Sequence, residues 1–323
     1  MTDLLLYGAK EEYFDIASER KLSLARVVCQ RRLRYTLMTA EGEIDCTVSG
    51  KFSYAAHRPV DYPVVGDWVL YSAHGIETLV ERKTLLTRAA AGKDRYPQPI
   101  AANMDFCFIC IPANAFNPRK LERYLAVTEC SGAKSVVVLT KADLVSNIEQ
   151  ICTTARAFAP TAEIIACSNK SDEGYDAAHR YMKVGITAVL IGPSGVGKST
   201  LINALAGSKI KTNEVRSDGK GRHTTTVREL ILLDSGGILI DNPGMRELGL
   251  EDSDVNAAFP DIDKLSVNCF FDDCTHMHEP RCAVRAAVAR GEISQERYDS
   301  YVKLKREENA RDRRRITDLW RKK

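Results

Sequence analysis

Long apolar runs are missing from this sequence of 323 residues: none approaches the roughly 18 consecutive apolar residues that a membrane-spanning helix needs. The N-terminus carries three leucines but soon turns acidic, and it lacks both a basic start and a small-residue cleavage site. Internal repeats and low-complexity tracts are also absent. With 44% hydrophobic and 28% charged residues, the composition is that of an ordinary globular protein. We therefore expect a cytoplasmic protein with no membrane partner.

The net charge is small, at +3, and does not by itself indicate a nucleic-acid partner. The basic residues are concentrated in two segments, CQRRLRY at 29–35 and KLKREENARDRRRITDLWRKK at 303–323. Either segment alone fits a solvated face with interspersed charges. Two such segments, one toward each end of the chain, favour an anionic partner.

The ten cysteines are spread along a long chain without a secretion signal, which argues against a disulfide scaffold. Several stand in apolar runs and are expected to pack as small hydrophobes: Cys29, Cys46, Cys130 and Cys167. Cys107 and Cys110 form a CxxC within DFCFICI, which is typical of a buried strand. Residues three apart on a strand point to opposite faces, so packing is expected there rather than metal or redox chemistry.

The chain length and the change of pattern along it predict three domains. Residues 1–88 hold about five short strands separated by turn signals, which suit a small closed barrel, the OB-fold being the leading candidate. Residues 89–255 begin with a linker-like stretch, AAAGKDRYPQPIAAN, and then alternate strands with helices, as in a doubly wound parallel sheet. Residues 256–323 are helical and carry cysteine and histidine, ending in a basic helix.

The segment GPSGVGKST at Gly192–Thr200 matches the G-x-x-x-x-G-K-[ST] pattern and lies between an apolar strand and a helix. Backbone N–H groups and the helix N-terminus can then surround phosphates. Lys198 would reach the β- and γ-phosphates and Ser199 would ligate Mg²⁺. The predicted nucleotide-binding residues of this loop are Gly192, Pro193, Ser194, Gly195, Val196, Gly197, Lys198, Ser199 and Thr200.

The base is expected to be guanine. Thr140, Lys141 and Asp143 follow a buried strand and resemble the Asn-Lys-x-Asp element, in which a carboxylate accepts from two guanine donors that adenine does not offer. Thr140 replaces the usual Asn, so a hydroxyl stands in for a carboxamide. Ser168, after the next strand, resembles the second guanine element. Each tetrapeptide is weak alone, and their joint placement favours GTP over ATP.

The sequence Asp241-Asn242-Pro243-Gly244 fits the Asp-x-x-Gly element, in which Asp241 holds Mg²⁺ through a water and Gly244 senses the γ-phosphate. Between it and the phosphate loop lies GRHTTTVREL. Thr225, with Thr224 and Thr226 as alternatives, would complete the Mg²⁺ shell. An ordinary solvent-facing strand start is the other interpretation of this segment.

The catalytic candidates are His223, Lys198 and Thr225. In Ras-like enzymes a Gln after Asp-x-x-Gly orients the attacking water. Met245 stands at that position here and cannot do so, and His223, beside the threonines, is the best substitute in this chain. A solvated loop histidine is the alternative.

The guanine elements precede the phosphate loop, so the usual order of a small GTPase is circularly permuted. With a barrel before it and a Cys/His module after it, the chain resembles the RsgA (YjeQ) family of circularly permuted small-ribosomal-subunit biogenesis GTPases. The segments that carry the resemblance are PVVGDWV, IAANMDFCFI, LERYLAV, GPSGVGKSTLINAL, GRHTTTVREL, DNPGMRELGL and FFDDCTHMHEPRCAVRAAVARGEISQERYDSY. Departures are Thr140 for the usual Asn and Asn242 for the usual Thr.

Three cysteines and one histidine within fourteen residues offer a closed tetrahedral set for structural zinc: Cys269, Cys274, His276 and Cys282. The spacing is not that of a C2H2 finger. The family resemblance implies a zinc module with this spacing and with the ligand at His276 rather than at the neighbouring His278. Such a short segment has little core of its own, so zinc would contribute its folding energy.

The resemblance implies a GTPase in late maturation of the small ribosomal subunit, with hydrolysis stimulated by the subunit. Expected partners are the small subunit with its rRNA and GTP or GDP, and a monomer is expected. Two rivals stay open: a regulatory GTPase that never contacts RNA, and an RNA-binding adaptor whose nucleotide only locks a conformation.

Overall fold

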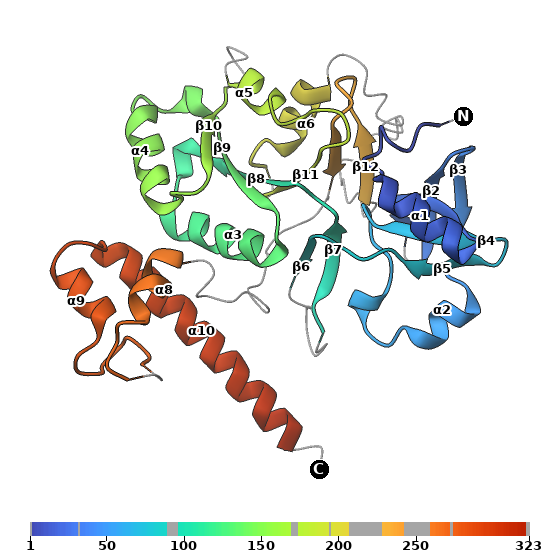
Figure 1. Cartoon of the computed structure of the whole chain (residues 1–323). Coiled ribbons are helices and arrows are strands. Elements are labelled where there is room, and N and C mark those ends of the chain that lie inside the picture. The colour runs from blue at the N-terminus through green and yellow to red at the C-terminus, as the bar shows by residue number, and fades with distance from the viewer. Residues whose placement is uncertain are drawn as a thin grey trace, which may run out of the picture.

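The computed structural model describes residues 2–31, 33–88, 96–168, 174–193, 195–206, 228–241, 259–271 and 274–320. Three regions follow one another along the chain: a barrel, a sheet flanked by helices, and a group of C-terminal helices (Figure 1). This arrangement confirms the predicted fold class. No helix among the described residues is both long enough and apolar enough to cross a bilayer.

The barrel consists of five strands and a short helix: β1 (Ser23–Arg31), β2 (Arg34–Thr39), β3 (Gly42–Cys46), α2 (Gly50–Ala55), β4 (Trp68–Ser72) and β5 (Gly75–Leu79). Antiparallel pairs join β3 to β2, β2 to β1, β1 to β4 and β4 to β5. A parallel bridge between Val48 and Ile76 closes the ring. Five short strands that close into a barrel agree with the predicted OB-fold, and the helix between the third and fourth strands was not predicted. The interior is filled by apolar side chains such as Tyr35, Leu37 and Val69.

Helix α1 (Glu11–Arg20) covers the outside of the barrel. Its buried residues Tyr13 and Ala17 pack with Leu24 and Trp68, and the ring centres of Tyr13 and Trp68 are 5.5 Å apart. The 3-10 turn η1 (Pro59–Asp61) leads from α2 toward β4. The N-terminal extension is therefore part of the packed structure of the barrel region.

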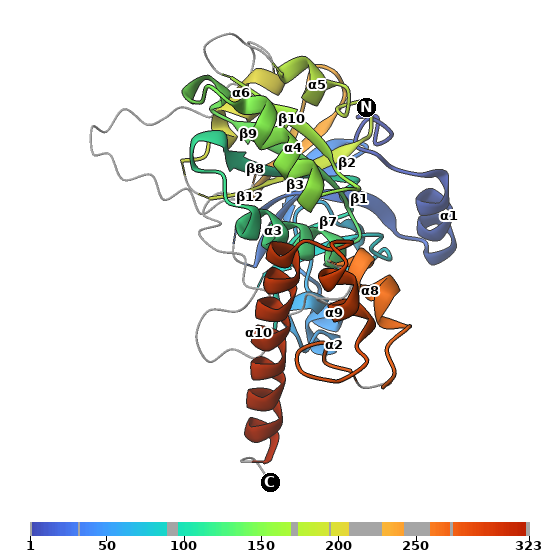
Figure 2. The ribbon, with the colours of Figure 1, turned by 90° about the vertical axis from the view of Figure 1, so that its left-hand side faces the viewer.

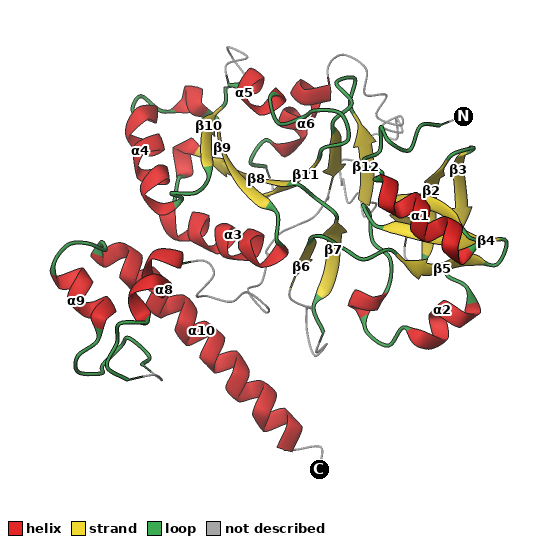
Figure 3. Cartoon of the chain, viewed as in Figure 1, coloured by secondary structure: helices red, strands yellow, loops and turns green. Residues whose placement is uncertain are grey.

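Helices cover both faces of the central sheet (Figure 3). Its strands are β8 (Phe106–Pro112), β9 (Lys134–Thr140), β10 (Glu163–Ala166), β11 (Thr187–Ile191), β12 (Arg228–Leu232) and β13 (Ile238–Asp241). The order is β10-β9-β8-β11-β13-β12, and all neighbours are parallel except β13 and β12. Helices α3 (Pro118–Ser131) and α4 (Ile148–Phe158) share one core, and α5 (Tyr175–His179) and α6 (Lys198–Ala206) share the other. The 3-10 turns η2 (Ala113–Ala115) and η3 (Ala142–Leu144) follow β8 and β9.

The central sheet continues into the barrel. Strand β12 pairs antiparallel with β1, with Cys29 opposite Glu229 and Gln30 opposite Arg228. The two regions thus share one hydrogen-bonded sheet, which the sequence pattern did not indicate because the paired segments lie about 200 residues apart.

A hairpin of β6 (Leu85–Arg88) and β7 (Gln98–Ala102) connects the barrel to β8. The prediction of a linker over 89–103 was therefore wrong for Gln98–Ala102. The Gly, Pro and charge content of the segment indicated a linker, yet a two-stranded hairpin tolerates Pro99 because each strand is an edge strand. The residue opposite Pro99 is Thr87, next to an irregularity in the register.

The C-terminal helices α8 (Pro260–Ser266), α9 (Ala283–Ala289) and α10 (Gln295–Trp320) lie against the side of the sheet that carries α3, and α10 runs out beyond it (Figure 2). Arg297 of α10, 6% exposed, makes two contacts of 2.6 Å with Asp261 of α8. It also donates to Glu122 Oε1 of α3 at 3.4 Å and to the carbonyl of Phe158 at the end of α4 at 3.3 Å. Burial raises the pKa of Glu122 to about 7. This buried charge cluster fixes the C-terminal helices to the central domain.

Cys107 and Cys110 are both fully buried and belong to the two different cores on opposite faces of the sheet. Burial raises the pKa of each thiol to about 12. The packing interpretation of this CxxC is therefore confirmed. Cys130 is exposed, contrary to the prediction that it packs in an apolar run, because it faces away from the sheet on the last turn of α3.

Candidate nucleotide-binding site and metal cluster

The predicted nucleotide-binding residues lie at the carboxyl ends of parallel strands. Thr140 is the last residue of β9, Gly192 follows β11, and Asp241 is the last residue of β13. Ser168 follows β10 by two residues. Because the carboxyl ends of parallel strands meet at one edge, four segments of chain converge there, as in other open α/β sheets that bind ligands.

The phosphate loop runs from β11 to α6 and depends on glycine for its backbone path. Gly192 has φ of 143°, and a Cβ there would lie 2.3 Å from the carbonyl oxygen of Cys110 on the neighbouring strand β8. Gly197 also has a positive φ, of 110°. Residues with a side chain rarely adopt these conformations, so the glycines of the motif are required by the turn itself. The helix α6 then begins at Lys198 and directs its N-terminus toward the loop.

Lys198 curls back over the loop that precedes it. Its Nζ donates to the carbonyl oxygens of Gly192 at 2.8 Å and Pro193 at 2.9 Å. Burial lowers the pKa of Lys198. The ammonium group is thus held over the space enclosed by the loop, where a phosphate oxygen can replace either carbonyl as its acceptor. Ser199, next on the helix, is exposed.

Thr140 contacts the phosphate loop. Its buried hydroxyl donates to the carbonyl oxygen of Val196 at 2.6 Å and lies 3.4 Å from that of Ile111. The hydroxyl therefore braces the loop from strand β9, which β8 separates from β11. This contact with the loop is one that a hydroxyl can make in place of the carboxamide of the usual Asn.

The two segments that resemble guanine elements lie in contact. Ser168 Oγ donates to Asp143 Oδ1 at 3.2 Å, and the backbone N–H of Ala142 donates to the carbonyl of Cys167 at 3.1 Å. Lys141 has φ of 56°, a left-handed conformation that turns the chain sharply between β9 and η3. The turn brings the Asp143 carboxylate next to the segment after β10.

Some predicted site residues lie outside the described residues: Ser194, His223, Thr225 and Gly244. The same holds for Met245, the residue on which the argument for His223 depends.

A phosphate-loop sequence after β11, segments that resemble guanine elements earlier in the chain after β9 and β10, and an aspartate at the end of β13 together match a circularly permuted P-loop GTPase. The RsgA GTPase family model matches residues 79–251. The chain belongs to this family.

Curated relatives match nearly the whole chain. The small ribosomal subunit biogenesis GTPase RsgA 2 of Lactiplantibacillus plantarum is 44% identical over 304 residues, covering 91% of this chain and 85% of that protein. The RsgA protein of Xanthomonas axonopodis pv. citri, which carries the same functional name, is 43% identical over 291 residues, covering 88% and 80%.

Two solved structures are also similar. YjeQ from Thermotoga maritima superposes with a TM-score of 0.67 at 28% identity, covering 88% of this chain and 98% of that one. YloQ, described as a circularly permuted GTPase, gives a TM-score of 0.64 at 28% identity, with coverage of 90% and 96%. The permuted order inferred from the motifs is thus found in a related structure.

A second cluster of chemically active side chains lies between α8 and α9. The ligand atoms of Cys269, Cys274, His276 and Cys282 all lie within 4.8 Å of one another. His276 Nδ1 is 3.4 Å from Cys269 Sγ and 3.6 Å from Cys282 Sγ, and the two sulfurs are 3.9 Å apart. Around a tetrahedral zinc ion, Zn–S bonds are about 2.3 Å and Zn–N bonds about 2.0–2.1 Å. This geometry places a nitrogen ligand roughly 3.6 Å from a sulfur ligand, and two sulfur ligands roughly 3.8 Å apart. The four side chains therefore fit a zinc ion, whereas a sulfur separation of 3.9 Å excludes a disulfide.

The surroundings of the cluster also suit a cation. Cys282 is the N-cap of α9, and its sulfur accepts from the backbone N–H of Arg285 at 3.5 Å, a contact that favours a thiolate. Burial raises the pKa of the Cys274 thiol to about 12, and a metal ion deprotonates a thiol that coordinates it. The hydroxyl of Tyr298 on α10 donates to the carbonyl of His276 at 2.7 Å.

Glu279 is a residue that the sequence analysis did not single out. Its carboxylate accepts from the backbone N–H groups of Met277 and His278 at 3.1 Å and from the hydroxyl of Thr275. The Thr275 hydroxyl and these N–H groups lower the pKa of Glu279 to about 2. The side chain shapes the loop that presents Cys274 and His276. Its one signal in the sequence is an acidic residue inside the segment CTHMHEPRC.

Proposed function

We propose that this protein hydrolyses GTP as an assembly factor in late maturation of the small ribosomal subunit, and that the subunit stimulates hydrolysis. The observation that carries the proposal is a permuted GTPase site within a chain that matches proteins named for small-subunit biogenesis over about nine-tenths of its length. The cytoplasm, where subunits are assembled in bacteria, is the proposed location.

In this proposal the Asp143 carboxylate accepts from two donors of guanine, and a backbone N–H near Ser168 meets its O6 atom. Their contact at 3.2 Å supports a shared base pocket. Thr140 acts on the phosphate loop, and the Lys141 side chain covers the base. The proposed role of Lys198 is to neutralise the β- and γ-phosphates, for which its position over the loop is suited.

The magnesium ion that accompanies GTP would be held by Ser199 and Thr225, with Asp241 acting through a water. Mg²⁺ supplies charge neutralisation at the transferring phosphoryl group. Gly244 would sense the γ-phosphate. The placement of Asp241 at the end of β13, beside β11 and its phosphate loop, supports this assignment.

Zinc is the proposed metal of the C-terminal cluster, bound by Cys269, Cys274, His276 and Cys282. With no open position, it would hold the loop between α8 and α9 rather than take part in hydrolysis. The distances among the ligand atoms support this role.

The rRNA contacts are proposed for the barrel, the zinc module and the basic end of α10, with the protein acting as a monomer. The turn between β1 and β2 exposes Arg31, Leu33 and Arg34, and the loop between the first two strands is a usual nucleic-acid contact of OB-folds. Contacts of such residues with phosphates would be salt-sensitive and independent of base sequence.

The test is GTP turnover of the full chain with purified small subunits, with large subunits and with free RNA, using Lys198→Ala as the inactive control. Selective stimulation by small subunits is expected. Equal turnover under all conditions would point to a regulatory GTPase outside the ribosome. Binding to small subunits without any stimulated turnover would point to an RNA-binding adaptor.

His223 is the proposed orienting group for the attacking water when the subunit is bound, because Met245 cannot serve. An orienting or acid–base group is worth on the order of 100-fold in rate. His223→Ala is therefore expected to lose most of the stimulated single-turnover rate with saturating small subunits and to keep nucleotide binding. His74→Ala, which removes an exposed imidazole from the barrel, is the matched control. A full stimulated rate in His223→Ala would leave the histidine as a loop residue.

A further inference from the structure

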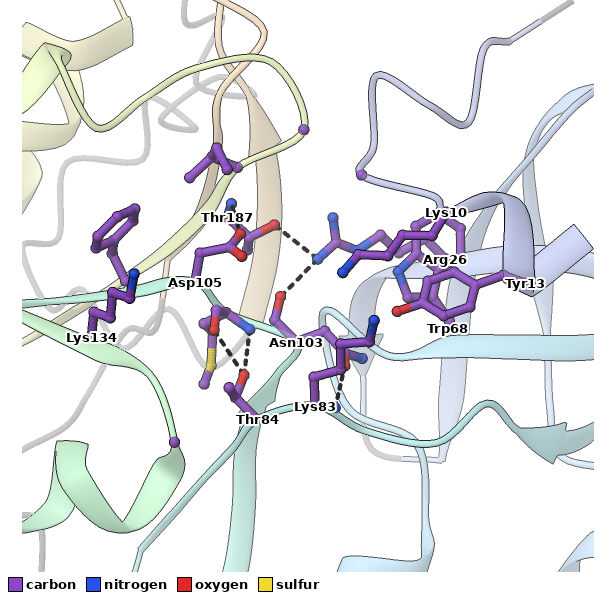
Figure 4. A pocket seen from close by; sticks show the side chains of 16 residues that line it. Lys10, Tyr13, Arg26, Trp68, Lys83, Thr84, Asn103, Asp105, Lys134 and Thr187 are labelled. Atoms are coloured by element: carbon purple, nitrogen blue, oxygen red, sulfur yellow. Dashed lines mark hydrogen bonds between the residues drawn. The ribbon is translucent and has the colours of Figure 1, made fainter.

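A cavity of about 330 Å³ lies at the junction of the barrel and the central domain, away from the nucleotide site. It is bounded by the segment before α1, by the strands β1 and β4, and by the amino ends of β8, β9 and β11 (Figure 4). The phosphate loop lies at the opposite, carboxyl edge of the same strands. A volume of this size is at the lower end of the range for small-ligand pockets, which occur preferentially at domain junctions.

Most of the charged side chains that line this junction pocket are basic. Lys10 and Lys83 lie on one wall and Lys134 on the opposite wall, with Asp105 between them (Figure 4). Arg26 forms part of the floor. Glu12 adds a second carboxylate by pairing with Lys83 at 2.7 Å. Four cationic groups against two carboxylates leave an excess of two positive charges.

The two negative groups have partners within the fold. Asp105 Oδ2 accepts from the backbone N–H of Thr187 at 2.8 Å and thereby fixes the start of β11 beside the start of β8. Within the part of the chain that the structure describes, neither Lys10 nor Lys134 forms an ion pair. Their charges are therefore available to a ligand.

Lys10 and Lys83 lie on the same wall of the pocket. The neighbouring ammonium group of Lys83 lowers the pKa of Lys10, as expected for two like charges close together. Glu12 neutralises one of the two charges. An anion placed between them would relieve the remaining repulsion.

Arg26 makes the floor rigid. Its guanidinium, 1% exposed, donates to the Thr187 hydroxyl at 3.0 Å and to the carbonyls of Gly66 and Asn103 at 3.3 Å. It also lies 5.4 Å from the centre of the Trp68 ring. These contacts tie the barrel to β11 and to the turn before β8, so the walls of the pocket are positioned before any ligand arrives.

We propose that the junction pocket binds a phosphate group through Lys10, Lys83 and Lys134. A tetrahedral anion with several acceptor oxygens can contact ammonium groups from two walls at once, which a monovalent carboxylate on one wall cannot do. The phosphate belongs either to a small phosphorylated solute or to the backbone of an RNA that lies against the barrel. The proposal does not depend on the ribosomal role.

The test uses the full chain saturated with GDP, so that the nucleotide site is filled, and titrates inorganic pyrophosphate by calorimetry and by phosphorus NMR. The variants are Lys10→Ala/Lys83→Ala and, on the opposite wall, Lys134→Ala. The control Lys51→Ala/Lys120→Ala removes the same charge from exposed positions on α2 and α3. A second arm measures binding of a fluorescent single-stranded RNA of roughly ten nucleotides, a length suited to one OB-fold.

Saturable binding of pyrophosphate that is weakened roughly tenfold or more in both variants, but not in the control, identifies a site for a phosphorylated solute. Weakened RNA binding in the variants alone, without pyrophosphate binding, assigns the phosphate to an RNA backbone. If both probes bind the variants and the control equally, the proposal is wrong. Thermal unfolding of each variant separates a loss of ligand contacts from a loss of fold.

Discussion

In the candidate nucleotide site Thr140, Gly192 and Asp241 lie at or just after the carboxyl ends of strands in one sheet, whereas in the Cys/His cluster the four side chains lie on the loop between α8 and α9 and at the N-cap of α9. The strands β8, β9 and β11 are almost wholly buried, so their ends are fixed by packing on both faces. The loop at 267–282 exposes Val267, Phe270 and Phe271 and has little apolar packing of its own.

The two sites therefore obtain their rigidity from different sources. The sheet positions its residues whether or not a nucleotide is bound, because the hydrogen-bonded strands and the helices around them are already stable. The loop between α8 and α9 would instead depend on the metal ion proposed for Cys269, Cys274, His276 and Cys282. Removing one component should therefore dismantle the metal cluster but only impair the nucleotide site.

The largest effect is expected from Cys269→Ala/Cys274→Ala. Structural zinc contributes on the order of 10 kcal/mol in small zinc modules, so the loop and α9 should lose their order when two ligands are removed. The zinc content of dialysed protein, measured by elemental analysis, should fall from about one ion per chain to none, while GDP binding persists. Cys130→Ala, an exposed cysteine outside the cluster, should keep its zinc. A double variant that retains a full equivalent of zinc would remove the assignment.

Lys198→Ala tests the other half of the comparison. The ammonium that lies over the phosphate loop should be lost without disturbing the strands, because Lys198 is only partly buried and bonds to loop carbonyls. GTP turnover is expected to fall by roughly 100-fold or more, with unchanged thermal unfolding. Ser199→Ala should behave similarly through the loss of its Mg²⁺ contact. Wild-type turnover in either variant would contradict the role given to the loop.

A change of base preference is expected from Asp143→Asn. Xanthine presents an acceptor where guanine has its amine, so the amide should favour xanthine nucleotides over guanine nucleotides. A hydrogen bond to a charged group is worth about 1.5–3 kcal/mol, which corresponds to roughly 10- to 100-fold in affinity. The measurement is the affinity for GDP and XDP, with Asp176→Asn on the exposed face of α5 as the control. An unchanged ratio of the two affinities would argue against base recognition by this carboxylate.

The smallest effect is expected from Thr140→Val, which removes only the hydroxyl that donates to the Val196 carbonyl. Leaving a buried carbonyl without its donor costs about 1–3 kcal/mol of stability. Here the cost would destabilise the conformation of the phosphate loop. GDP affinity should fall by roughly tenfold or less, and Thr140→Ser should restore it. If valine and serine give equal affinities, the brace has no effect on nucleotide binding.

The phosphate loop and the Cys/His cluster could be predicted from sequence because each is defined by a few residue types at fixed, short spacings. Few kinds of ligand suit such residues at those spacings. Gly192 is the clearest case, since the motif requires glycine and the structure explains it by the carbonyl of Cys110. The strands of the central domain could be predicted equally well, because short, mainly apolar runs such as SVVVLT are typical of strands buried on both faces.

Contacts between distant segments could not be predicted in this way. The bond from Thr140 to Val196 joins residues 56 apart, and the cluster of Arg297, Glu122 and Asp261 joins three helices. The Gly, Pro and charge content of residues 89–103 does not indicate the strand that contains Pro99, because its pairing with β6 depends on a partner strand that the local pattern does not show.

The pairing of β12 with β1 has a mechanical consequence. The barrel cannot rotate about the central sheet without either breaking the pairs of Cys29 with Glu229 and Gln30 with Arg228 or carrying β12 along. Arg228 is the first residue of β12, and five residues before it in the chain stands His223. A rotation of the barrel would therefore move Arg228, which ends the segment that carries the proposed catalytic histidine. The movement would pass through the two residue pairs that join β1 to β12.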